Sequence, residues 1–134
     1  MPAVGANPLY THAYIASEVM TAKHFVKVNA TEDYIDICDT DGERVFGVIE
    51  ESADADDVTN LKRLTVTVLG VAVVIVGAGA TIAFGDPVMT DELGCAISLA
   101  TTTADQNVAG IAMADGVAAD WLAVLLTPGA SEST

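Results

Sequence analysis

Apolar and polar residues alternate through the first half of the chain in short runs separated by turn-forming residues. Residues 25–28 and 34–37 alternate with the two-residue period of a half-buried strand. A hairpin-type turn follows at residues 39–42, where Gly42 suits a left-handed backbone, and residues 44–49 return as another strand. This half of the chain is therefore predicted to be a series of strands joined by turns.

The longest apolar segment, residues 64–85, carries no charged side chain and must be buried in something. Its length fits the ~20 residues of a membrane-spanning helix. Lys62 and Arg63 precede it and Asp86 follows it, which is a charge asymmetry that a membrane protein shows. A transmembrane span at residues 64–85, in a membrane-anchored or surface-layer module, is therefore the alternative interpretation.

The residue types in this segment favour strands instead. Valine, isoleucine and threonine are stiff at χ1 and suit a pleated surface. Residues 64–68 also alternate apolar and hydroxyl side chains, and Gly70 interrupts the run. We therefore expect one strand within residues 61–69 and a second at residues 71–76.

A dinucleotide-binding loop is the third interpretation of the same segment. Gly77 and Gly79 follow an apolar strand, as in the Gly-rich fingerprint of such loops. The third glycine of that fingerprint is replaced by Ile82, and the turn signal at residues 85–87 leaves no room for the helix that holds the pyrophosphate. We interpret the two glycines as a turn between strands.

The second half continues the pattern of short apolar runs and turns. Strands are expected at residues 95–99, 108–113 and 121–126, separated by polar or Gly-containing loops. Roughly eight short strands with turn signals every 8–12 residues predict an all-β sandwich or barrel.

The chain is expected to divide into three parts. Residues 1–22 carry early prolines and no alternation, which favours an extended N-terminal arm, with a short helix possible at residues 13–22. Residues 23–129 form the β domain. Residues 130–134 are a small polar tail that we expect to be disordered.

Composition and charge narrow the class of protein. The 134 residues include nineteen Asp and Glu but only five Lys and Arg, for a net charge of −14, so binding to nucleic acid is disfavoured. Such acidity also suits adaptation to high salt, where screening removes the repulsion between carboxylates. The two cysteines, Cys38 and Cys95, have no ligand spacing and are expected as buried thiols, and no secretory leader is visible.

Motifs with catalytic chemistry do not emerge from the sequence. His12 and His24 lie outside any metal-binding pattern, and there is no nucleophile elbow or phosphate loop. Residues 50–57 contain five carboxylates but no mid-loop glycine, so a solvated loop is expected in place of a calcium site. The sequence therefore predicts that the protein is not an enzyme and binds no cofactor or metal.

The order of turns and strands resembles one known family. Residues 42–48 lead into the acidic loop and an apolar strand. Three short motifs follow in order, namely G-x-x-I-x-x-G-D-x-V at residues 79–88, D-x-x-G at residues 91–94 and G-I-A at residues 110–112. This arrangement, over residues 23–129, resembles the capsid cement, or head decoration, proteins of tailed viruses.

The resemblance implies a small all-β structural protein that binds the outer surface of an assembled capsid, where its partner is the major capsid protein. It further implies a homo-oligomer, often a trimer near three-fold positions, with no catalysis and no cofactor. The acidic surface agrees with an exterior location, away from packaged DNA. Combined with the salt hypothesis, it points to a host that grows at high salt.

Candidate contact residues for the capsid or a neighbouring subunit lie in the N-terminal arm. Apolar and aromatic side chains in an arm must pack on their own domain or on a partner, and aromatic anchors dominate interface energetics. The candidates are Leu9, Tyr10, Tyr14 and Ile15.

Overall fold

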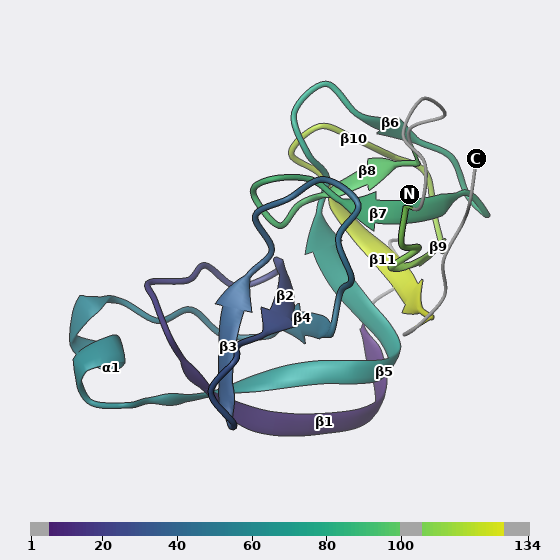
Figure 1. Ribbon diagram of the computed structural model, residues 1–134. Coiled ribbons are helices and arrows are strands. Elements are labelled where there is room, and N and C mark those ends of the chain that lie inside the picture. Colours follow the sequence, from purple (N-terminus) through teal and green to yellow (C-terminus); the bar gives the residue numbers. More distant parts are fainter. Residues whose placement is uncertain (1–5, 100–105, 128–134) are drawn as a thin grey trace.

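The computed structural model describes residues 6–99 and 106–127, and its regular elements there are strands apart from one five-residue helix, which confirms the all-β prediction (Figure 1). Within these residues nine strands form one sheet, in the order β1-β3-β2-β4-β5-β11-β9-β7-β8, and β6 and β10 form a second, small sheet. The strands are β1 (Asn7–Ala16), β2 (Phe25–Val28), β3 (Tyr34–Ile37), β4 (Gly47–Ile49), β5 (Arg63–Ile75), β6 (Thr81–Ile82), β7 (Pro87–Thr90), β8 (Ala96–Ser98), β9 (Gly110–Ala112), β10 (Gly116–Val117) and β11 (Trp121–Leu126).

Strand β5 is the element that both halves of the fold share. It is 13 residues long and pairs with β1, β4 and β11, and in Figure 1 it runs as a bent ribbon between the two groups of strands. The prediction of two strands separated at Gly70 is wrong. Gly70 has φ of +99°, and a Cβ there would lie 2.5 Å from the backbone nitrogen of Leu9. A glycine therefore lets the strand bend against β1 without ending.

The first group of strands closes into a ring. β1 pairs with β3 on one side and with β5 on the other, so the order β1-β3-β2-β4-β5 returns to β1. The closure is made at the end of β1, where Ile15 and Ala16 pair with Tyr34 and Ile35 of β3. Its interior is a buried apolar cluster of Ala16, Met20, Val26, Ile35, Ile49, Ala53, Leu64 and Val66.

The second group continues from the far end of β5. β11, β9, β7 and β8 follow in the sheet, and a parallel bridge from Val76 to Ala96 brings β8 back beside the end of β5. Its core contains Val74, Val88, Leu122 and Val124. Phe25 of β2 and Val48 of β4 belong to the same core, so these two side chains link the two groups of strands.

The N-terminal segment is part of this architecture. Residues 7–16 form β1, which pairs along β5 from Asn7 opposite Val71 to Ile15 opposite Arg63. The short helix considered for residues 13–22 is wrong because residues 13–16 belong to β1, where backbone pairing with β5 takes precedence over local propensity. The tail at residues 130–134 lies outside the described residues.

The acidic loop contains the helix α1 (Ala55–Thr59). Asp54 caps this helix, since its side chain accepts a hydrogen bond from the backbone nitrogen of Asp57 while the Asp57 carboxylate accepts one from the backbone nitrogen of Asp54. This reciprocal pair is a capping box. Residues 50–57 were expected as a loop, and the spacing of these two aspartates is the signal for a helix start.

The segment at residues 64–85 folds as β5, a turn at residues 78–79 and β6. Its turn glycines join two strands, as interpreted from the sequence, with no helix after them to hold a nucleotide. Within residues 6–99 and 106–127, no helix has the length and hydropathy needed to cross a membrane. The transmembrane alternative is therefore not favoured.

Candidate functional site

The residues with the potential for chemistry are dispersed over the fold. His12 is exposed on β1, and His24 Nδ1 lies 3.0 Å from the carbonyl oxygens of Thr21 and Ala22. Within residues 6–99 and 106–127, no three His, Cys, Asp or Glu side chains are grouped so as to hold a metal ion.

Of the two thiols, Cys38 is buried and Cys95 is partly buried. Burial raises the pKa of Cys38 to about 12 and that of Cys95 to about 11. Because the thiolate is the reactive form, both side chains stay protonated and unreactive near neutral pH. The expectation of a small buried thiol is confirmed for Cys38, whereas Cys95 is only partly buried.

The carboxylates of the acidic loop support local structure. Glu50 accepts a hydrogen bond from the Thr67 hydroxyl, and Glu51 accepts one of 2.9 Å from the backbone nitrogen of Thr65. The hydrogen bond from Thr65 lowers the pKa of Glu51 below its ordinary value. These contacts attach the loop to β5.

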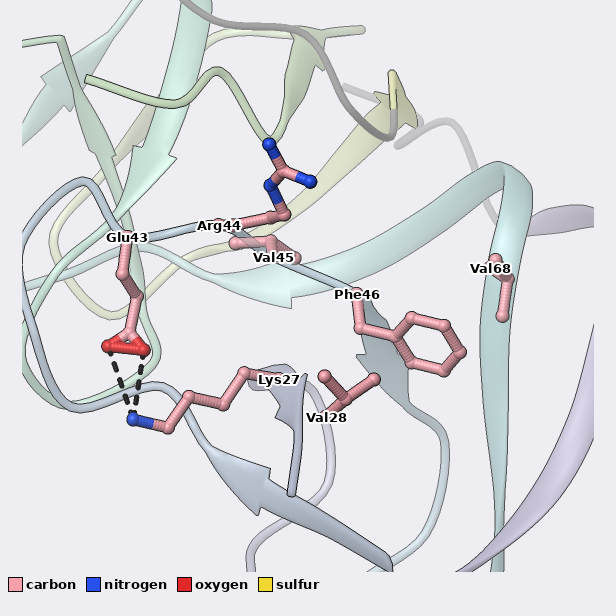
Figure 2. A pocket seen from close by; sticks show the side chains of 7 residues that line it. All are labelled: Lys27, Val28, Glu43, Arg44, Val45, Phe46 and Val68. Atoms are coloured by element: carbon pink, nitrogen blue, oxygen red, sulfur yellow. Dashed lines mark hydrogen bonds and ion pairs between the residues drawn. The ribbon is translucent and has the colours of Figure 1, made fainter. Parts of the chain in front are cut away.

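A groove of about 430 Å³ opens beside the first ring of strands (Figure 2). Figure 2 shows the Phe46 ring between Val28 and Val68 on one side, and Lys27 reaching Glu43 on the other. The groove is lined by Lys27, Val28, Glu43, Arg44, Val45, Phe46 and Val68. Phe46 also packs edge-on against Tyr14, with ring centroids 5.3 Å apart.

The charges around this groove are largely paired. Lys27 Nζ lies 2.7 Å from Asp39 and 3.1 Å from Glu43, and the hydrogen bond to Asp39 raises the pKa of Lys27. Arg44 is exposed at the rim. The groove can hold an apolar side chain, because Val28, Val45, Phe46 and Val68 line it.

The predicted contact residues of the N-terminal segment lie in two different environments. Leu9 and Tyr10 are 79% and 50% exposed, and Tyr10 stands opposite Leu69 of β5, which is itself 43% exposed. Tyr14 is partly buried beside Phe46, and Ile15 is partly buried between its partners on β3 and β5. Leu9 and Tyr10 are thus the two that are open to a partner.

A partly exposed apolar surface that sequence reasoning missed lies on β5, β11 and β9; Trp121 and Leu125 are exposed and its other members are partly buried. Its members point away from the core and are neighbours in register; they are Val71, Val73, Ile75, Ile111, Trp121 and Leu125. We call these six residues the outer strip. The signal was available, because residues 71–76 and 121–126 are apolar at both odd and even positions, whereas a sheet with one wet face alternates.

Comparison with known proteins places this all-β fold in a family. The family described as "Phage cement protein" matches residues 7–127 of the chain, which includes β1 through β11. The chain belongs to the phage cement protein family. The resemblance inferred from the turns and strands is therefore confirmed, and the match extends through β1.

A solved structure has the same fold. The head fiber gp8.5 N base of bacteriophage phi29 superposes with a TM-score of 0.67 at 18% sequence identity, and the match covers 88% of this chain and 93% of that one. At this identity the likeness establishes the fold alone. The search of curated protein sequences gave no match.

Membership of the family defines the general role of the chain. This phage cement protein is a structural virion component that binds the capsid and decorates its exterior. Its exposed features agree with such a role, since they are apolar side chains and a shallow groove suited to contact with another protein.

Proposed function

We propose that this cement protein acts as a homotrimer that binds neighbouring major capsid subunits from outside, and that the start of β1 makes the contact. The observation that carries the contact is the exposure of Leu9 and Tyr10 on a strand that pairs with β5. A preorganised strand loses little conformational freedom when it binds. Tyr14 and Ile15 complete the proposed contact segment by fixing its position on the domain.

In the proposed mechanism, binding of the cement protein stabilises the assembled capsid by mass action. A protein that binds the assembled lattice and not the free subunits stabilises the lattice by its binding free energy, about 2.7 kcal/mol per site at a hundredfold excess over Kd. A trimer that engages three equivalent sites also gains avidity, because the second and third contacts form at high effective concentration. This role involves no catalysis and no cofactor.

Replacing Leu9 and Tyr10 by serine tests the contact. We expect the L9S/Y10S variant to bind undecorated capsids of its own phage at least about tenfold more weakly, because exposed aromatic and apolar anchors contribute most of an interface's free energy. Co-sedimentation across a concentration series measures the apparent Kd. Val117→Ser is the matched control, since Val117 is 53% exposed on β10. Equal binding by the double variant and the control would contradict the proposed contact.

We also propose, from its net negative charge, that the protein is adapted to high salt. The net charge of −14 produces self-repulsion that screening weakens, as the Debye length falls from about 10 Å at 0.1 M salt to about 3 Å at 1 M. We expect the thermal midpoint to rise steadily with NaCl over this range. Sucrose at equal osmolarity is the control for exclusion of solute. A thermal midpoint that does not change with the NaCl concentration would contradict this proposal.

A further inference from the structure

The second half of β5 is apolar on both of its faces. Ala72 and Val74 point into the core and are 0% exposed, and Val76, directly after the strand, is 2% exposed. The alternate residues Val71, Val73 and Ile75 point the other way and are partly buried. A strand with one face in water normally carries polar residues on that face, and a strand that is apolar on both is normally covered on both.

The neighbouring strands continue the same face. Register places Trp121 opposite Ile75 and Leu125 opposite Val71, and Ile111 of β9 stands opposite Leu125. Trp121 is 67% exposed and Leu125 is 40% exposed. The outer strip therefore spans three neighbouring strands, and on β11 the buried Ala123 lies between Trp121 and Leu125.

Among residues 6–99 and 106–127, a charged side chain lies beside the exposed end of this strip. The Lys23 ammonium lies 5.7 Å from the centre of the Trp121 ring, at one end of the strip, and 3.9 Å from Glu50. Other exposed apolar residues such as Phe84 and Leu93 stand at turns, and single exposed residues of that kind are common on protein surfaces. An uncharged strip that spans three strands indicates a partner surface.

We propose that the outer strip is the contact between copies of this chain, a proposal that rests on the homotrimer proposed above. Three strips that face a common axis cover one another. Each copy carries a charge of −14, so close approach is favourable only where carboxylates are absent, and none of the six strip residues is charged. A second copy carries the same uncharged surface and meets this requirement.

The timing of the two contacts also assigns the strip to a second copy and not to the capsid. A cement protein folds and diffuses before it reaches an assembled shell, and its capsid contact stays open during that time. Permanent subunit interfaces are more apolar than contacts made later. Trp121 alone buries about 150–250 Å² when it is covered, a substantial part of the ~800 Å² that each partner contributes to a standard interface.

Trp121 also supplies a direct test, because it is the single tryptophan of the chain. In the full-length protein at micromolar concentration, we expect a trimer by sedimentation velocity, with blue-shifted tryptophan emission that acrylamide quenches weakly. Dilution below the dissociation range is expected to shift the emission to the red. A trimer whose tryptophan is as accessible as free indole would overturn this assignment and leave the trimer itself standing.

Substitution completes the experiment. We expect Val73→Asp to weaken self-association at least about tenfold, because the new carboxylate would be buried without a partner. Leu125→Ser, at a more exposed position, is the milder variant should Val73→Asp fail to fold by circular dichroism. Val117→Asp, outside the strip, is the control and is expected to remain a trimer. A trimer that persists in Leu125→Ser and in a folded Val73→Asp overturns the strip alone, whereas a monomeric unmodified protein overturns both this inference and the proposed homotrimer.

Discussion

Deletion of residues 2–15 is expected to unfold the protein. These residues include all of β1 except Ala16, and β1 is the strand that closes the first ring by pairing with β3 and β5. Each lost backbone hydrogen bond removes about 1 kcal/mol, and loss of Tyr14 exposes Phe46. The combined loss exceeds the ~5 kcal/mol that marks the lower end of domain stability. Circular dichroism and urea denaturation at high salt measure the effect.

The matched control removes residues 2–6, which precede β1. We expect this variant to unfold at the same urea concentration as the full chain, because the pairs from Asn7 onward are retained. A cooperative transition of unchanged midpoint in the longer deletion would show that the ring does not need β1. The comparison also explains why point substitutions, and not deletion, are the proper test of the capsid contact.

Local sequence pattern predicts the all-β class and many of the strands of this fold. Alternation at residues 25–28 and 34–37 coincides with β2 and β3, and residues 121–126 coincide with β11. The bend at Gly70 could not be predicted in the same way, because a glycine inside a strand indicates either a break or a close backbone approach. Only the presence of β1 beside it decides between these two.

The participation of residues 7–16 in the sheet also depends on residues that are distant in the sequence. Pro8 and the absence of alternation favour an arm locally, whereas β1 is held by pairs with β5 some fifty residues away in the chain. Bulges between Pro8 and Thr11 disturb the two-residue period that a sequence pattern would need.

The candidate contact surfaces were likewise predictable from the sequence only in part. Aromatic and apolar residues near the N-terminus were recognisable as contact candidates, but the difference in exposure between Tyr10 and Tyr14 depends on Phe46. The apolar character of both faces at residues 71–76 and 121–126 is visible in the sequence, but it does not indicate which residues of β5, β9 and β11 become neighbours. The register between Ile75 and Trp121 is what makes the strip visible as one surface.

Replacement of Gly110 by alanine is expected to lower the free energy of unfolding much more than replacement of Gly79 by alanine. Gly110 is buried in β9, between β11 and β7, and a Cβ there would collide with the backbone carbonyl oxygen of Leu125 and with a methyl group of Val124. A clash with backbone cannot be relieved by a side-chain rotation, so β9 and β11 must separate. We expect a loss of about 3 kcal/mol or more in the free energy of unfolding, measured by urea denaturation at high salt.

Gly79→Ala is the control that separates this collision from the general cost of replacing glycine. Gly79 has φ of +74°, a backbone conformation that alanine adopts at a cost of about 1 kcal/mol, but no atom lies within 4 Å of the added Cβ. Gly110 is the converse case, with ordinary φ and no space. If close approach of β9 and β11 governs the second core, Gly110→Ala loses several times more stability than Gly79→Ala. Equal losses would mean that the strands move apart easily, and that the Gly-Ile-Ala sequence of β9 has no packing requirement for its glycine.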